Sequence, residues 1–532
     1  MKNNNNHRAT GKLLATTLCL PLSFTLPLLP GLGGGGRGEE GKQEEGISFT
    51  LLHTNDQHGH LLPFSYPSRV SLKDAVGKMP VTKDIGGIAR RATLVKQIKA
   101  REKNCWLIDA GDCMDGSPFS VEYFAQADYA AMNAVGYDFG VFGNHDFNMT
   151  VPQFQALIKT PTFPLVLANV SEKKSGKPIL PPYVIKEWGG LRVALFGLVT
   201  SSTKTYTAAK AAYKVDDPIP IATALVPELR KQADLVIAIT HIGLDEDRQL
   251  ARSVPGIDVI VGAHSHTRLP VGVIENGTII LQDHQWVGEL GRLDFTAKRD
   301  AAGTWKIDHF TEKLLPITKA LPEDPATAKV VVGYWDKIKA KYDEVIGETT
   351  ADLTDTPDHD IQPTNYYLVC DAMAEATGAD FYIENQAGVR AALLKGKITF
   401  GDIVGVDPFD NALYTFKIQG RDLKKLLGTL RPIPSASLRY SVKQRGTSRF
   451  GWELIGATLK GKPIDNDTYY FGAASSYLFS SAIRRVALDG KETGTTRRTV
   501  LVEYLKKHVP YSPREDGRVR FDGGNPLPPD PQ

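Results

Sequence analysis

The stretch Gly143-Asn144-His145-Asp146-Phe147-Asn148 directly follows an apolar run at residues 137–142, which predicts a buried strand. It places an amide and an imidazole side by side on the loop that ends this strand. One of these side chains could hold a metal ion while the next contacts whatever the metal binds. If other strand ends bring further ligands, the stretch is part of an active site.

Five apolar runs predict strands, and each is followed at once by residues that can bind metal. The runs cover residues 47–53, 105–108, 137–142, 235–239 and 259–262. The residues that follow them are Asp56 and His58, Asp112, Asn144 and His145, His241, and His264 and His266. Strand ends on one edge of a sheet converge on one crevice, so these side chains are expected to meet in space. A lone DxH or HxH would be weak evidence, but five such placements in order indicate a metal site.

The expected ligands are carboxylates, an amide and imidazoles, with no thiolate. This mixture suits Mn, Zn, Fe or Co better than Mg. With His145 left to contact what the metal binds, seven ligands remain; these are too many for one tetrahedral ion, but they suit two divalent ions that share Asp112 as a bridge. Two ions can hold and deprotonate a bridging water while they neutralise charge on a phosphoryl oxygen. The expected reaction is hydrolysis of a phosphoester by a metal-bridging hydroxide.

Length and charge limit the classes of protein and partner. The chain has 532 residues, 63 Lys plus Arg and 60 Asp plus Glu, which gives a formal net charge of +3. The length suits two catalytic-scale domains, and the mixed charge argues against a nucleic-acid partner. Lys2, Arg8 and Lys12 precede an apolar stretch at residues 13–32 with three prolines, which resembles a secretory signal. We expect a secreted or periplasmic protein with no stable membrane span after signal cleavage.

Apolar segments that alternate with helical or loop segments predict an α/β protein with two folded domains. The expected divisions are a signal peptide at 1–32, a flexible linker at 33–46, a catalytic domain at 47–318, a linker helix at 319–344, a second α/β domain at 345–522 and a disordered tail at 523–532. A helix at residues 365–377 and a strand at 412–418 are expected in the second domain. The three cysteines that would remain, Cys105, Cys113 and Cys370, do not form a disulfide framework.

The motifs in order resemble the calcineurin-like metallophosphoesterases: DxH at 56–58, GD at 111–112, GNHD at 143–146, the lone His241 and GxHxH at 262–266. The segments LLHTNDQHGHLLP at 51–63 and GDIVGVDPFDN at 401–411 narrow the resemblance to the secreted bacterial 5′-nucleotidase and cyclic-nucleotide phosphodiesterase family. The resemblance covers residues 47–521. It implies a two-sheet α/β sandwich as the metallophosphoesterase domain, followed by a 5′-nucleotidase-like substrate domain that rotates about the linker helix.

The resemblance also implies a role for each motif residue. Asp56, His58, Asp112 and His266 would hold one metal, and Asp112, Asn144, His241 and His264 would hold the other. His145 would stabilise charge on the phosphoryl group and help the leaving oxygen depart.

The chain departs from the family at Asn148, where the usual motif GNH[ED]FD has an Asp that pairs with the His. An amide oxygen accepts an imidazole N–H but cannot stabilise an imidazolium as a carboxylate does. We therefore expect His145 to protonate less readily, and turnover to be slower, than in a relative that has Asp at this position.

The second half resembles the family less closely. Residues 385–390 resemble its phosphate-binding loop, so Arg390 is expected to clamp phosphate and Asn385 to make a polar contact. Phe409 and Tyr477 would stack on a base, with Asn411 close to Phe409 in the sequence. Alternatively, Phe409 and Tyr477 are core aromatics, and Arg390 forms a surface ion pair. The family's GGDG[FY] loop, which supplies a ribose-binding Asp, is absent.

Several functions fit these features. Nucleoside 5′-monophosphates or related small phosphoesters are the default substrates. A cyclic-nucleotide phosphodiesterase, a sugar-phosphatase or a sulfur-ester hydrolase would use the same scaffold. A non-catalytic surface-binding relative is disfavoured, because such a protein has no need to keep all seven metal ligands.

Overall fold

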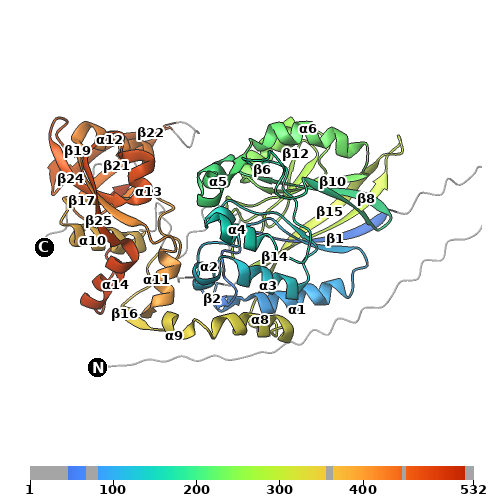
Figure 1. Ribbon diagram of the computed structural model, residues 1–532, viewed down its shortest axis with the longest axis horizontal. Helices are drawn as coiled ribbons and strands as arrows, with labels where there is room; N and C mark the ends of the chain where they lie inside the picture. Colours follow the sequence, from blue (N-terminus) through green and yellow to red (C-terminus); the bar gives the residue numbers. More distant parts are fainter. Residues whose placement is uncertain (1–45, 67–81, 355–362, 446–450, 522–532) are drawn as a thin grey trace, which may run out of the picture. The chain divides into compact units, whose positions relative to one another are not determined.

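The computed structural model describes residues 46–66, 82–354, 363–445 and 451–521 (Figure 1). The expected signal peptide, the expected tail and all but the last residue of the expected linker lie outside these ranges. Among the described helices, none has both the length and the apolar character that a membrane crossing requires.

The first sheet carries the first three predicted strands. Its order is β15 (Trp305–Pro316), β14 (Glu289–Arg299), β1 (Ile47–Thr54), β4 (Cys105–Asp109) and β5 (Phe139–Gly140). Strand β4 pairs in parallel with both β1 and β5, so all three end at the same edge. The prediction of strands here is confirmed, although β5 occupies only two residues of the apolar run at 137–142.

The second sheet carries the other two predicted strands. Its order is β12 (Val273–Glu275), β13 (Thr278–Leu281), β11 (Val259–Val261), β10 (Leu235–His241), β8 (Leu191–Val199) and β7 (Tyr183–Trp188). Side chains of β8 alternate between two cores, because successive residues of a strand point to opposite faces. Val193 and Leu195 join the large core shared with the first sheet, whereas Ala194 and Phe196 pack with helix α6 (Pro218–Arg230). The two sheets therefore form the expected α/β sandwich.

Helices cover the outer faces of this sandwich. In Figure 1, α6 lies on the side of the sheets opposite α1 (Ile88–Lys99) and α3 (Gln126–Val135). Apolar side chains of α1 such as Ile88 and Val95 are fully buried in the large core. The remaining elements of this half are β2 (Pro63–Phe64), β3 (Ile85–Gly86), α2 (Pro118–Tyr123), η1 (His145–Phe147), α4 (Val151–Leu157), β6 (Val170–Glu172), η2 (Ser201–Thr205), α5 (Thr207–Ala212), β9 (Tyr213–Val215) and α7 (Leu244–Ser253).

The linker predicted as one helix is two helices, α8 (Pro325–Trp335) and α9 (Lys339–Tyr342). Helix α8 packs on α1 and α3, whereas α9 packs on α11 (Phe400–Val406) of the second half. Ile338, at the break, is buried with Tyr342 and Val404 in a small core of their own. The break lets one amphipathic segment bury its apolar residues in two different places.

The second half has its own apolar core. A five-stranded sheet has the order β20 (Ile433–Pro434), β17 (Phe381–Glu384), β24 (Tyr469–Ser475), β19 (Ala412–Gln419) and β25 (Ala487–Thr496). The helix and strand predicted at 365–377 and 412–418 are present as α10 (Thr364–Thr377) and β19. The other elements are β16 (Val345–Thr349), β18 (Gly396–Thr399), α12 (Gly420–Leu430), β21 (Leu438–Gln444), β22 (Trp452–Leu459), β23 (Lys462–Pro463), α13 (Ser476–Leu478), η3 (Phe479–Ile483), α14 (Arg497–Lys507) and β26 (Val519–Arg520).

Candidate metal centre

The carboxyl ends of the parallel strands bring the expected metal-binding side chains together. Two groups of three have their candidate ligand atoms within 4.8 Å of one another: Asp56, His58 and His266, and Asp112, His241 and His264. Asp112 lies between the groups, because its Oδ2 is 3.0 Å from Nε2 of His241 and 3.9 Å from Nε2 of His58. This is the geometry that a bridging carboxylate requires.

The loops that carry these residues have an uncommon backbone conformation. Asp56, His58, Asp112, His264 and His266 all have positive φ, between 49° and 73°. Residues other than glycine rarely adopt this left-handed backbone region, and each one that does lowers the stability of the fold by about 1–3 kcal/mol. Backbone strain of this kind gathers at functional sites, so its concentration here supports a functional role for these five residues.

Two motif loops are locked against each other. A Cβ atom at Gly143 would overlap the Asp112 carboxylate, so only glycine fits at this position. The Asp146 carboxylate then accepts backbone N–H groups from both loops, from Asp112 at 3.1 Å and from Gly143 at 2.8 Å. The acidic residue of GNHD thus clamps the two loops in register.

The imidazoles of His58 and His241 are held in a ligand-ready orientation. Nδ1 of His58 lies 2.8 Å from the carbonyl oxygen of Met114, and Nδ1 of His241 lies 2.7 Å from that of Ala110. When Nδ1–H donates to a carbonyl, the Nε2 lone pair is left for a metal.

Buried polar atoms without partners test whether this site fits metal ions. Oδ1 of Asn144 is buried and makes no hydrogen bond among the described residues, whereas buried Nε2 of His241 and Oδ1 of Asp56 face only other candidate ligands, Asp112 at 3.0 Å and His266 at 3.3 Å. Buried polar atoms normally find partners, and divalent cations are the partners that this mixture of oxygen and imidazole nitrogen selects. The donor set therefore fits two divalent ions.

Charge interactions within the site set the protonation of its members. Burial alone would raise the pKa of Asp112, but the neighbouring imidazoles of His241, His145 and His58 together outweigh burial and hold that pKa well below its usual range. Burial lowers the pKa of His241, but the carboxylates of Asp112 and Asp56 together outweigh burial and raise it to about 10. A metal ion bound at Nε2 would displace this proton. Burial and the neighbouring Arg390 hold the pKa of His58 well below its usual range. His58 is thus kept in the neutral form that a metal ligand needs.

His145 has a different partner from the one expected. Its Nδ1 lies 2.7 Å from Oδ2 of Asp115, and the Asn148 amide donates to the same oxygen at 2.8 Å. The amide of Asn148 therefore holds a carboxylate, not the imidazole, and the expectation that an amide orients His145 is wrong. The sequence signal for Asp115 was a second acid three residues after Asp112, on the same loop.

Tyr206 is a second residue that the motifs did not reveal. Its hydroxyl accepts a hydrogen bond from Nδ2 of Asn144 at 2.7 Å and lies 3.4 Å from Nε2 of His145. This contact turns the amide so that Oδ1 of Asn144 is left for a metal. Tyr206 precedes the short helix α5 and belongs to no motif, so only the fold brings it here.

The expected substrate residues of the second half lie in different surroundings. Arg390 reaches the metal centre, with Nη2 at 3.4 Å from Nε2 of His58. Phe409 lies beside it, with its ring 6.0 Å from the Arg390 guanidinium and 6.0 Å from the His145 ring. Asn385 instead contacts its own loop: Nδ2 donates to Glu384 at 2.7 Å, and Oδ1 accepts from the Gly388 amide at 3.2 Å.

Asn411 and Tyr477 line a separate cavity of about 670 Å³. We call it the Tyr477 cavity; its lining also includes Tyr414, Phe479 and Arg484. Tyr477 is 58% exposed, and Oδ1 of Asn411 accepts a hydrogen bond from Ser476 at 3.0 Å. The structure therefore brings Tyr477 and Asn411 to one cavity, while Phe409 stands next to the metal centre.

Family comparisons agree with this architecture. Residues 49–268 match the family described as calcineurin-like phosphoesterase, and residues 345–486 match the one described as 5′-nucleotidase, C-terminal domain. The chain therefore carries a calcineurin-like phosphoesterase domain followed by a 5′-nucleotidase C-terminal domain. It is a metal-dependent phosphoester hydrolase.

The chain matches some relatives over nearly their whole length and others over only a part. The chain is 27% identical to protein UshA of Yersinia enterocolitica, over 88% of this chain and 92% of that protein. It is also 27% identical to the trifunctional nucleotide phosphoesterase protein YfkN of Bacillus subtilis, over 89% of this chain but only 35% of YfkN. The solved 5′-nucleotidase precursor of Thermus thermophilus superimposes with a TM-score of 0.79 at 25% identity, over 90% of this chain and all of that one.

Proposed function

We propose that the protein releases phosphate from nucleoside 5′-monophosphates or related small phosphoesters. The observation that carries the proposal is the position of Arg390, a cation from the second half whose guanidinium lies 3.4 Å from His58 in the first metal-capable group. A fork of N–H donors beside two metal positions matches the charge and shape of a phosphoryl group.

The seven residues Asp56, His58, Asp112, Asn144, His241, His264 and His266 would hold two ions of Mn, Zn, Fe or Co. When bound, such ions activate water and neutralise developing charge on the phosphoryl group. The chain contributes the geometry, because Asp146 locks the loops and Tyr206 turns the Asn144 amide toward the site.

His145 is the proposed proton donor to the leaving oxygen. A carboxylate at Nδ1, here that of Asp115, fixes the ring and stabilises positive charge on it. Nε2 would then face the substrate, 3.4 Å from the Tyr206 hydroxyl. Since the carboxylate partner is retained, the physical reason for expecting slow turnover from Asn148 no longer applies.

The second half would supply selectivity. We assign Arg390 to the phosphate, and Phe409, Asn411 and Tyr477 to the organic part of the substrate. Arg498 donates to the carbonyl oxygens of Asp407 and Pro408, at 2.9 and 3.0 Å, and so supports the loop that carries Phe409. Asn385 acts by shaping the loop that carries Arg390.

We also propose export, with residues 1–32 removed as a signal peptide, because basic residues precede the apolar stretch at 13–32. Mass spectrometry of the N-terminus of the mature protein tests this part. A mature N-terminus near residue 33 is expected, and recovery of the intact Met1 end would contradict the proposal.

The function is tested by removing bound metal and adding back Mn, Zn, Co or Mg. Phosphate release from AMP and other nucleotides is then measured. Release that returns with Mn, Zn or Co is expected. A protein that binds the ions but hydrolyses none of these esters would refute the proposal.

A further inference from the structure

Arg497 is among the most deeply buried side chains of the second half. It is the first residue of helix α14, and only 1% of its surface is exposed. The helix dipole disfavours a positive charge at this end, and removal of a charge from water is costly. Apolar residues often replace buried charges without loss of stability. Stability alone therefore does not account for a charge at this position.

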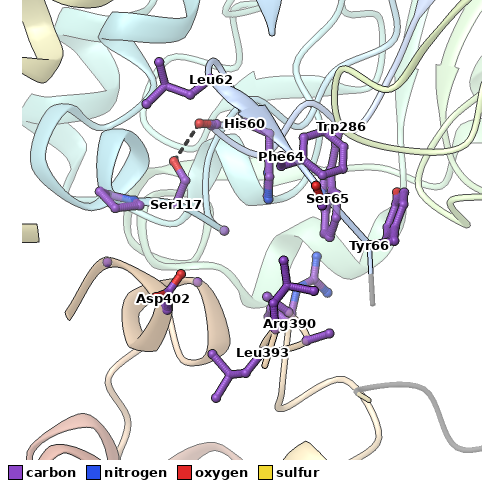
Figure 2. A pocket seen from close by; sticks show the side chains of 18 of the residues that line it. His60, Leu62, Phe64, Ser65, Tyr66, Ser117, Trp286, Arg390, Leu393 and Asp402 are labelled. Atoms are coloured by element: carbon purple, nitrogen blue, oxygen red, sulfur yellow. Dashed lines mark hydrogen bonds between the residues drawn. The ribbon is translucent and has the colours of Figure 1, made fainter. Parts of the chain in front are cut away.

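The first loop that Arg497 holds is residues 385–390, which we call the phosphate loop because it carries Arg390. Nη2 of Arg497 donates to the carbonyl oxygen of Gly388 at 2.9 Å. Nη1 of Arg497 lies 3.1 Å from Oε2 of Glu384, the last residue of β17, directly before this loop. Figure 2 shows Arg390 reaching from the phosphate loop into a cavity of about 820 Å³. Arg497 thus fixes the loop that presents the proposed phosphate-binding residue.

The second loop that Arg497 holds is residues 407–411, which we call the Phe409 loop. Nη1 of Arg497 also lies 3.6 Å from Oδ1 of Asp407. The backbone N–H of Arg497 donates to the carbonyl oxygen of Asn411 at 2.9 Å. These two contacts lie on either side of Phe409 in the sequence, so they hold both ends of the loop that carries the ring.

One guanidinium therefore bridges two carboxylates, one beside the phosphate loop and one in the Phe409 loop. Glu384 and Asp407 are 0% and 1% exposed, and buried carboxylates of this kind need a cation nearby. The backbone adds a direct contact, because the N–H of Arg390 donates at 3.0 Å to the carbonyl oxygen of Val406, the residue before Asp407. Movement of one loop would break contacts that also hold the other.

We propose that Arg497 is a positioning residue that joins the phosphate loop and the Phe409 loop into one rigid unit. The inference rests on the proposed function and deepens it. Arg497 is too deeply buried to contact a substrate, so it acts through Arg390 and Phe409. With the two loops held at a fixed separation, the site favours phosphoesters whose base lies at a matching distance from the phosphate.

The test separates the two loops by means of two product inhibitors. Inorganic phosphate probes the phosphate loop without a base, and adenosine probes the Phe409 loop without a phosphate. The inhibition constants of both and the KM for AMP are measured with the Mn-loaded full chain. Arg497→Lys keeps a positive charge beside both acids but lacks the planar fork that reaches two loops at once. Asp407→Asn removes only the ion pair to the Phe409 loop.

Arg518→Lys is the matched control. Arg518 is also 1% exposed, and its guanidinium donates to Asp371, Asp516 and the carbonyl oxygen of Pro434, all outside the two loops. This variant should lower the stability of the second half. The KM for AMP and both inhibition constants should stay within about twofold of the wild type, because neither loop loses a contact.

Arg497→Lys is expected to raise the KM for AMP by about tenfold and both inhibition constants by about threefold or more, because both loops lose their alignment. Asp407→Asn is expected to raise the inhibition constant of adenosine by about threefold and to leave that of phosphate within about 1.5-fold. Manganese content should be unchanged in every variant, since the proposed metal ligands lie in the first half.

The inference is overturned if either inhibition constant is unchanged in Arg497→Lys, or if Arg518→Lys shows the same rises. For Asp407→Asn, a rise for adenosine alone supports the inference, whereas no rise, or an equal rise for phosphate, overturns it. The second variant therefore decides even if Arg497→Lys does not fold. A wild type that hydrolyses AMP but is not inhibited by adenosine overturns the inference and leaves the proposed function standing. A wild type that hydrolyses no nucleotide refutes the proposed function itself.

Discussion

The two halves of the molecule hold their functional residues in different ways. In the first half, Asp56, Asp112 and His241 are fully or almost fully buried at strand ends and are fixed by neighbouring backbone groups. In the second half, Arg390 lies on a loop and Tyr477 is 58% exposed. Under the proposed function, the chemistry depends on the buried scaffold of the first half, whereas substrate choice depends on the more exposed loops of the second.

The largest effect is expected from the scaffold itself. Asp112→Asn removes the carboxylate that lies between the two metal-capable groups, so activity should fall by about a thousandfold or more. Metal content per chain should fall as well. Asp308→Asn, on an exposed ion pair with Lys298, is the control and should change neither quantity. Full metal content and near-normal turnover in Asp112→Asn would contradict this view of the first half.

A smaller effect is expected at Asp115, whose carboxylate pairs with His145 in place of an Asp at position 148. Asp115→Asn should lower kcat by about a hundredfold, because His145 loses the charge at Nδ1. The double variant Asp115→Asn with Asn148→Asp returns a carboxylate to this group and should recover most of the activity. The ratio of the double to the single variant is the measurement. No recovery would show that the position of the carboxylate, not only its charge, is needed.

Arg390, the proposed phosphate-binding residue, reaches from the second half to His58 in the first. Arg390→Ala should lower kcat/KM for AMP by about 30- to 150-fold, about 2–3 kcal/mol, since a charged hydrogen bond to phosphate is lost. Arg421→Ala, on an exposed ion pair with Asp467, is a matched control in the same half. If both variants behave alike, Arg390 has no special role.

The exposed half should affect selectivity more than chemistry. Tyr477→Ala is expected to lower kcat/KM for AMP by about tenfold, the value of one lost stacking contact, and to leave p-nitrophenyl phosphate unchanged. The ratio of the two specificity constants checks this. Equal losses on both substrates would mean that Tyr477 stabilises the fold and does not bind the base of the substrate.

The smallest effect on activity is expected at a buried acid behind the metal loops. Burial raises the pKa of Asp128 from 3.8 to about 8, although Gln57 donates a hydrogen bond to it at 3.0 Å. Its stabilising contribution is therefore complete below pH 3.8 and is lost as the pH rises through about 8.

Asp128→Asn keeps the shape of this side chain without the titration. Between these two pKa values, the free energy of unfolding of the wild type should fall with pH more steeply than that of the variant, by about 1.4 kcal/mol per pH unit. Denaturant unfolding at several pH values measures both slopes. Equal slopes would show that Asp128 stays ionised in the folded protein.

The sequence was informative where function requires a fixed backbone. The five strand ends and their ligands follow from apolar runs and motif order, because residues such as Asp112 have little freedom once the strands form. Asp115 and Tyr206 were missed, since their roles arise only when separate loops meet. The break at Ile338 was missed for a similar reason: local spacing favours one helix, but packing on Val404 needs two.

The most direct test of the central claim is crystallography of the Mn-loaded protein with anomalous scattering. The account predicts two Mn positions, about 3.5–4 Å apart. One should contact Asp56, His58 and His266, the other should contact Asn144, His241 and His264, and Asp112 should contact both. A single position, or two positions without Asp112 between them, would contradict the account.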